Sequence, residues 1–278
     1  MLVWACIAPH GGELIPDLAD GDLARMQVTR RGMEGLGARC LAARPQTLVV
    51  LTPHGIEVEN HIAVAFAETA LGELDGPAGR GVSAAFPVDL ELAAALVQAV
   101  SERSVPVAPL VLTTAEGRPL PIFPLDFGAL VPLWFLGARW LEPPAIVVVT
   151  AARSLPRRQL VAAGEAVVEA AVRSGRRVAI VCSADLGHGH RADGPYGFSP
   201  TSATHDRAFC SAIRENALHR LLRWRGDWVE SAMPDGFWSS LVLHGALRAT
   251  PLQPELVSYE APTYFGMACA AFEPPPIP

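Results

Sequence analysis

The chain has 278 residues, half of them apolar, with 22 basic and 28 acidic side chains and a formal net charge of -6. This length and composition allow a large hydrophobic core, and we expect a single α/β domain over residues 1–278. The acidic balance argues against a nucleic-acid partner, and the complete absence of lysine from the sequence excludes Schiff-base chemistry and a Walker-type phosphate loop.

The cysteines and the first residues bear on the cellular compartment. The five cysteines are odd in number and form no Cys-x-x-Cys pair, so we expect buried thiols in a reducing cytoplasm. No basic leader precedes the first apolar run, which predicts no secretion. The most apolar stretch, residues 129–150, is interrupted by charged residues and prolines, so we expect no membrane partner.

Apolar runs and helical periodicities alternate along the chain. We expect strands at residues 2–8, 47–52, 61–67, 104–113, 145–150, from 178 onward, 255–259 and 265–272. We expect helices at residues 22–43, 87–102, from 126 onward, 155–173, 204–223 and 238–247, with loops at 72–81, 116–124 and 191–202 and a frayed end at 274–278. This alternation predicts a three-layer α/β/α fold with a central mixed sheet.

Three of the expected strands run directly into a loop that carries a histidine: His10, His54 and His188. Glycine beside each histidine lets the backbone bend, so the three imidazoles lie where strands end. One such histidine would more often cap a loop, but a repeated apolar strand followed by Pro-His-Gly favours a site. His10 and His54 are therefore candidate ligands of a divalent metal ion at one edge of the sheet.

Asp185 precedes His188 by three residues, a spacing at which a carboxylate can orient an imidazole as a proton shuttle or metal ligand. We therefore take Asp185 and His188 as candidate catalytic residues. His190 adds an alternative, because a His-x-His pair on an extended segment puts both rings on one face, as in zinc hydrolases. The remaining interpretation is a polar loop after a strand.

Short motifs occur in a specific order along nearly the whole chain. They are Ala8-Pro9-His10, Leu51-Thr52-Pro53-His54-Gly55, Leu125-Asp126-Phe127-Gly128, Ala184-Asp185-Leu186-Gly187-His188, Gly194-Pro195-Tyr196-Gly197, Asp235-Gly236 and Ala261-Pro262-Thr263-Tyr264-Phe265-Gly266-Met267. In their order and spacing the chain resembles the class III extradiol ring-cleavage dioxygenases of the LigB type, within the branch related to the Memo proteins.

The resemblance implies a non-haem Fe(II) ion held by two histidines and a carboxylate, with a catechol or aminophenol bound to the iron and O2 activated beside it. His10 and His54 match the metal histidines of this family, and His188 matches its acid/base histidine. A face of two histidines and one carboxylate leaves positions open for a small aromatic substrate and for O2. The oligomeric state, including a homo-oligomer, stays open.

Phe127 departs from the family, which often has histidine at this position of the motif. The resemblance places Asp126, Phe127 and the loop that carries Tyr196 around the substrate cavity. We expect Phe127 to make the cavity wall more apolar and to favour an uncharged substituent on that side.

The third metal ligand also departs from the family. Relatives commonly have Glu-Cys-Gly where this chain has Pro234-Asp235-Gly236, and proline cannot bind metal. We expect Asp235 to supply the carboxylate, with Asp235 as a simple helix cap as the structural alternative. The other candidate ligands are Glu13, Asp17 and Glu230.

Three functions compete at this stage. The first is an Fe(II)-dependent ring-cleaving dioxygenase, favoured by the retained His188. The second is a zinc-dependent hydrolase with Asp185 as its base and a ligand set of His10, His54, His188 and His190. The third is a Memo-like protein that binds a metal or a peptide without ring cleavage, favoured by Phe127 and Pro234.

Overall fold

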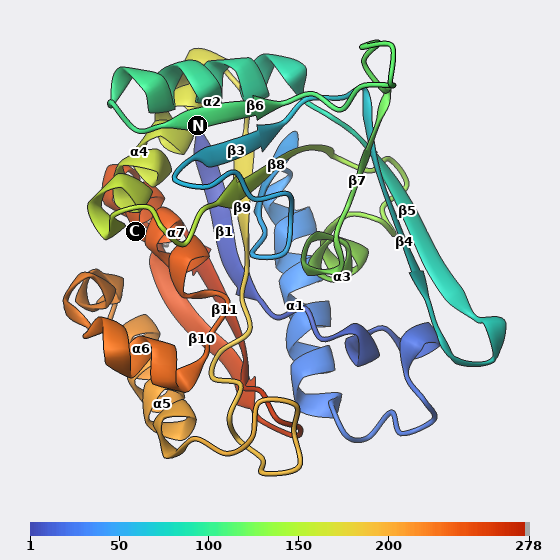
Figure 1. Cartoon of the computed structure of the whole chain (residues 1–278), viewed down its shortest axis with the longest axis vertical. Helices are drawn as coiled ribbons and strands as arrows, with labels where there is room; N and C mark the ends of the chain where they lie inside the picture. Colours follow the sequence, from blue (N-terminus) through green and yellow to red (C-terminus); the bar gives the residue numbers. More distant parts are fainter. Residues whose placement is uncertain (276–278) are drawn as a thin grey trace.

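The computed structural model describes residues 1–275, so the final residues of the end that was expected to fray lie outside the described part. A large mixed sheet lies between two layers of helices (Figure 1), which confirms the three-layer α/β expectation. Its strand order is β10-β11-β1-β9-β2-β8-β3-β6. The strands are β1 (Leu2–Ala8), β2 (Thr47–Leu51), β3 (Ile62–Ala65), β6 (Val107–Leu110), β8 (Ala145–Ala151), β9 (Val178–Ser183), β10 (Gln253–Glu260) and β11 (Met267–Glu273).

The centre of the sheet is parallel. Strand β9 pairs in parallel with both β1 and β2, and β2 pairs in parallel with β8. All four strands are covered on both faces, which explains why their sequences are continuous apolar runs without alternation. Since β1, β9 and β2 run in the same direction, their carboxyl ends meet at one edge of the sheet.

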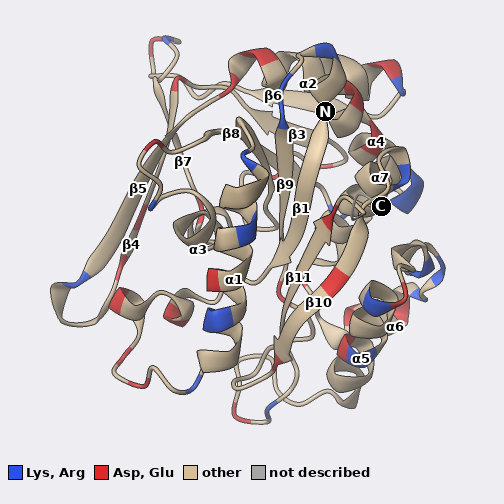
Figure 2. Cartoon of the chain, turned by 180° about the vertical axis from the view of Figure 1, so that it is seen from behind, with Lys and Arg blue, Asp and Glu red and all other residues tan. Residues whose placement is uncertain are grey.

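Helices cover both faces. They are α1 (Gln27–Ala43), α2 (Leu90–Glu102), α3 (Phe127–Leu136), α4 (Arg157–Arg173), α5 (Pro200–Arg214), α6 (Gly226–Ala232) and α7 (Phe237–Ala249), with short 3-10 helices η1 (Gly12–Leu14), η2 (Pro16–Leu18), η3 (Pro77–Gly79) and η4 (Leu218–Arg223). Helices α2, α4, α5 and α7 pack in one hydrophobic core, and α1 and α3 pack in the other. Charged residues lie on helices, on loops and on the edge strand β10, whereas the β1 ribbon carries none (Figure 2).

Helices α4 and α7 cross in close contact, and glycine makes this possible. A Cβ atom at Gly164 of α4 would lie 1.8 Å from the Val242 carbonyl oxygen of α7. A Cβ atom at Gly245 of α7 would lie 1.9 Å from the Val161 carbonyl oxygen. This contact anchors α7, whose first turn borders the site described below.

Two parts of the chain differ from the sequence expectation. The expected loop at 72–81 is a hairpin of β4 (Thr69–Asp75) and β5 (Gly81–Pro87), which with β7 (Ile122–Pro124) forms a separate three-stranded sheet. Gly72, read as a loop signal, lets the hairpin pack against Leu130 of α3. The helix expected over 204–223 is divided, because Asn216 adopts a positive φ after α5 and η4 follows.

Among residues 1–275, no helix combines the length and the apolar composition that a bilayer crossing requires. All five cysteines are buried and free, as the sequence indicated.

Candidate metal site

The site lies at the carboxyl edge of the parallel strands. His10 follows β1, His54 follows β2, and Asp185 follows β9, which lies between these two strands. Asp235 reaches the same point from the turn between α6 and α7. A Cβ atom at Gly236 would lie 2.1 Å from the Ala184 Cβ, so only glycine lets this turn approach the end of β9 closely enough.

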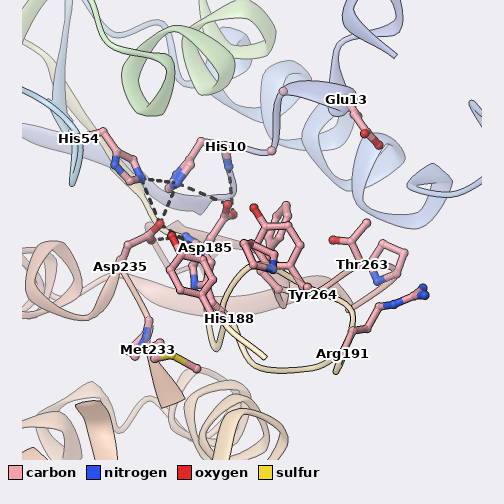
Figure 3. A pocket seen from close by; sticks show the side chains of 18 of the residues that line it. His10, Glu13, His54, Asp185, His188, Arg191, Met233, Asp235, Thr263 and Tyr264 are labelled. Carbon is pink, nitrogen blue, oxygen red and sulfur yellow. Dashed lines mark hydrogen bonds and ion pairs between the residues drawn. The ribbon is translucent and has the colours of Figure 1, made fainter. Parts of the chain in front are cut away.

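Three side chains converge on one point (Figure 3). The Asp235 Oδ2 atom lies 3.0 Å from His10 Nε2 and 3.2 Å from His54 Nε2, and the two Nε2 atoms are 3.1 Å apart. Neighbouring ligands that each lie about 2.1 Å from one ion at right angles are separated by about 3 Å. The spacing and the donor types therefore fit one divalent transition-metal ion.

Ser183 fixes the ring of His10 in the form that a metal requires. The Ser183 hydroxyl donates to the Gly128 carbonyl oxygen at 2.5 Å, so it can only accept from His10 Nδ1, which lies 2.8 Å away. Neutral His10 thus carries its proton on Nδ1 and presents the free lone pair of Nε2 to the site. This role was not predicted, because it depends on the register that pairs Ala8 with Ser183 and places the serine beside His10.

A proton bridges the site when no cation is bound. Burial opposes a charged His10, but the carboxylates of Asp185 and Asp235 outweigh it and raise the pKa of His10 to about 9. Burial also opposes a charged Asp235, yet His10 and His54 hold the pKa of this carboxyl well below its usual range. His10 and Asp235 therefore form an ion pair at neutral pH, and a metal ion would replace the proton between them.

Asp185 holds His10 and Asp235 in place through hydrogen bonds. Its Oδ1 atom accepts the backbone N–H of His10 at 3.1 Å, and its own N–H donates to Asp235 Oδ1 at 2.9 Å. The carboxylate makes no hydrogen bond to the His188 imidazole, so the expectation that Asp185 orients His188 is wrong. Burial raises the pKa of Asp185 to about 6.

His188 lies beside the three converging side chains. Its Nε2 atom is 3.7 Å from Asp235 Oδ2, which is longer than a hydrogen bond. The rings of Phe265 and Tyr196 flank the imidazole, each with a centroid 5.6 Å from that of His188. Asp185, His188 and Asp235 also present ligand atoms within 4.8 Å of one another.

His190 lies away from the site, which corrects the expectation of two imidazoles on one face. Its Nε2 atom pairs with Asp206 Oδ2 at 2.8 Å. The reason is that residues 187–190 form a bend, whereas the expectation assumed an extended segment. A zinc set that includes His190 is therefore excluded.

The bend is held by two buried polar residues of α5 that sequence reasoning missed. The N–H of Gly187 donates to Asp206 Oδ1 at 2.8 Å, and the N–H of Gly189 donates to the Ser202 hydroxyl at 2.9 Å. Asp206 also accepts from Tyr259 at 2.9 Å and pairs with His190. Both side chains are buried in the structure. In the sequence, the available signal was their spacing of four residues, which puts Ser202 and Asp206 on one face of a helix.

A cavity of about 870 Å³ opens beside His10, His54, His188 and Asp235. Phe127 lies in its wall, 41% exposed, and stacks on His54 with a centroid distance of 4.3 Å. Tyr196 also lines the cavity. Asp126 does not, because its carboxylate caps α3 by accepting the Ala129 N–H and the Thr52 hydroxyl.

Among the described residues, none of the other candidate carboxylates joins the two histidines. Glu13 and Glu230 line the cavity, and Glu13 pairs with Arg25, while Asp17 lies outside. The alternative that Asp235 merely caps α7 is also wrong, because Gly236 occupies the cap position and the Asp235 side chain binds elsewhere.

Comparisons with known proteins agree with the fold. Residues 5–270 match the family described as the catalytic LigB subunit of aromatic ring-opening dioxygenase. Protein CA_C1420 of Clostridium acetobutylicum is 24% identical over 254 residues, which are 91% of this chain and 54% of that protein, so the chain spans about half the length of this relative. The crystal structure of uncharacterized protein JW3007 from Escherichia coli K12 has a TM-score of 0.64 and 17% identity, with 97% of this chain and 99% of that chain covered.

Proposed function

The chain belongs to the LigB family of catalytic subunits of aromatic ring-opening dioxygenases, and from this premise we propose that it is an Fe(II)-dependent extradiol dioxygenase. Its substrates are a catechol or an aminophenol and O2. The observation that carries the proposal is the convergence of His10, His54 and Asp235 beside a large cavity. Five buried free thiols agree with work in the reducing cytoplasm.

His10, His54 and Asp235 would hold the ferrous ion, which when bound supplies the redox chemistry that joins O2 to the ring. The protein's own contribution is orientation and proton handling. Ser183 fixes the tautomer of His10, and Phe127 packs against His54 as an apolar wall for the ring. The rings of Tyr196 and Phe265 pack beside His188.

His188 is the acid/base in this proposal. Its Nε2 atom faces Asp235 from the cavity, so it can accept the phenolic proton of a bound substrate and later return it. His188 Nδ1 is buried and has no hydrogen-bond partner among residues 1–275, so no carboxylate fixes one tautomer.

A second candidate is a Memo-like protein that binds metal without cleaving rings. Phe127 favours it, because the ring stacked on His54 replaces a polar group beside the substrate. The zinc hydrolase has less support, since His190 is engaged by Asp206.

The test is anaerobic purification with metal analysis, followed by oxygen uptake with a panel of catechols and aminophenols. Bound iron with oxygen uptake and a yellow ring-opened product is the expected result. Iron without turnover supports the second candidate, and zinc without oxygen uptake contradicts the dioxygenase. The His10→Ala variant, which removes one ligand, serves as the control without metal.

A further inference from the structure

Asp235 belongs to two groups of potential metal ligands. The first group is His10, His54 and Asp235, described above, and the second is Asp185, His188 and Asp235. In the second group too, each residue offers a ligand atom, and these atoms lie within 4.8 Å of one another. Figure 3 shows His188 across the Asp235 carboxylate from His54. The two groups therefore adjoin at one shared carboxylate.

The ligand atoms of Asp185 and His188 are free to bind a cation. Asp185 is 3% exposed, and its Oδ1 atom accepts the backbone N–H of His10. Its Oδ2 atom accepts no hydrogen bond among residues 1–275 and lies 3.4 Å from His10 Nε2. Once that nitrogen binds an ion in the first group, Asp185 Oδ2 has no donor left, and a buried oxygen without a partner is costly. Asp185 and His188 both line the cavity, so an ion can reach them.

The donor types and their spacing indicate which ion fits and how tightly it binds. One imidazole and two carboxylates suit a divalent transition-metal ion, and two such ions that share a ligand lie about 3.5–4 Å apart in proteins. The 3.7 Å between His188 Nε2 and Asp235 Oδ2 exceeds the 3.0 Å and 3.2 Å from this oxygen to the histidines of the first group. The second group must contract around an ion, so it should bind more weakly and lose its ion on dialysis.

We propose that Asp185, His188 and Asp235 form a second, weaker site for a divalent transition-metal ion such as zinc, and that an ion in this site inhibits ring cleavage. The inhibition rests on the proposed function, in which the lone pair of His188 Nε2 accepts the phenolic proton of the substrate. An ion bound to that lone pair leaves no acceptor for the proton. Occupation of the second site itself does not depend on ring cleavage.

Zinc binding to metal-free protein tests the second site without any substrate. Calorimetry and equilibrium dialysis with zinc chloride should give two ions per chain, the second bound at least about tenfold more weakly than the first. His188→Ala should remove only the weaker ion, and His10→Ala should remove the tighter one. Asp185→Asn, whose amide oxygen can still accept the His10 N–H, should weaken mainly the second ion. His61→Ala, at a histidine outside the cavity, should change neither.

Oxygen uptake by iron-loaded protein with catechol tests the inhibition. Added zinc should abolish uptake over the concentration range that fills the weaker site, while the iron content stays at one ion per chain. Loss of iron in step with activity, or full activity with two ions bound, overturns the inhibitory role.

The zinc stoichiometry separates the second site from the proposed function. One zinc ion per chain in the wild type, or a second ion that binds His188→Ala unchanged, overturns the second site. Two zinc ions per chain in a protein whose iron form opens no aromatic ring contradict the proposed function and support the second site. Circular dichroism verifies that each variant is folded.

Discussion

The Nε2 atoms of His10 and His54 lie 3.1 Å apart, although 44 positions separate the two residues in the chain. Parallel strands on either side of β9 bring them together, and the carboxylate of Asp235 lies against both. Two imidazole nitrogens and one carboxylate at this spacing could hold one cation.

Replacement of either His10 or His54 by alanine should abolish stoichiometric metal binding, because two remaining ligands cannot hold the ion tightly. Metal analysis after dialysis measures this, and circular dichroism should show a retained fold. His61→Ala is the matched control, since His61 is partly exposed and its ring Nδ1 atom pairs with the Glu59 carbonyl oxygen. Retention of one metal per chain in the His10 variant would refute its assignment as a ligand.

Asp235→Asn should weaken Fe(II) binding by at least about tenfold, since a neutral amide removes the charge that balances the ion. Competition with a chelator gives the affinity. If Asp235 were only a helix cap, the Asp235→Asn protein would keep its metal, because asparagine caps helices as well as aspartate does. Unchanged affinity would remove Asp235 from the ligand set.

His188→Ala should retain iron and lose turnover by about two to four orders of magnitude, as expected when general acid/base catalysis is removed. The iron content and the rate are measured on the same preparation. Loss of the metal in this variant would show that His188 is itself a ligand.

Metal binding should release a proton. His10 has a pKa of about 9 in the metal-free protein, against an ordinary value of 6.5, so it is charged at pH 7 and must lose its proton to bind an ion. Calorimetry in buffers of different ionisation enthalpy should detect this release at pH 7, and metal affinity should rise with pH up to about 9. Absence of proton release at pH 7 would contradict this pKa.

The raised pKa of His10 should also make the stability of the metal-free protein depend on pH. A raised pKa stabilises the folded state fully below pH 6.5, and this contribution disappears as the pH rises through about 9. The Tm of metal-free protein should therefore fall between these values, and His10→Gln should flatten the decline. Asp185, with a pKa of about 6, titrates below this window. An equal decline of Tm in the wild type and in the His10→Gln variant would assign the decline to another titrating group.

Asp206→Asn should lower kcat about 10-fold or more with little change in KM, because the loosened bend no longer holds His188 in place. A shift in the pH profile of kcat distinguishes this role from a loss of folded protein. Ser211→Ala is the control, since Ser211 bonds only to the nearby Glu215 on an exposed part of α5. Equal effects on KM and kcat would contradict a positioning role.

The central strands and their strand-end histidines could be predicted from the sequence because each parallel strand is an unbroken apolar run that stops at a polar loop. The hairpin at 69–87 could not, because its glycines and acidic residues are typical of loops and only the approach of α3 explains Gly72. The side-chain direction of His190 could not be predicted, because it depends on the contact with Asp206 of α5, later in the chain. The role of Ser183 depended on the pairing of β1 with β9.

Insertion of dioxygen into an aromatic ring by the iron-loaded protein is the reaction that the proposed function requires. Its most direct test is turnover of a catechol under isotopically labelled O2, with mass spectrometry of the ring-opened product. Both labelled atoms should enter the product of the wild-type protein, and the His10→Ala variant should give no labelled product. A product without label, or no product from any catechol or aminophenol by protein with a full complement of Fe(II), would contradict it.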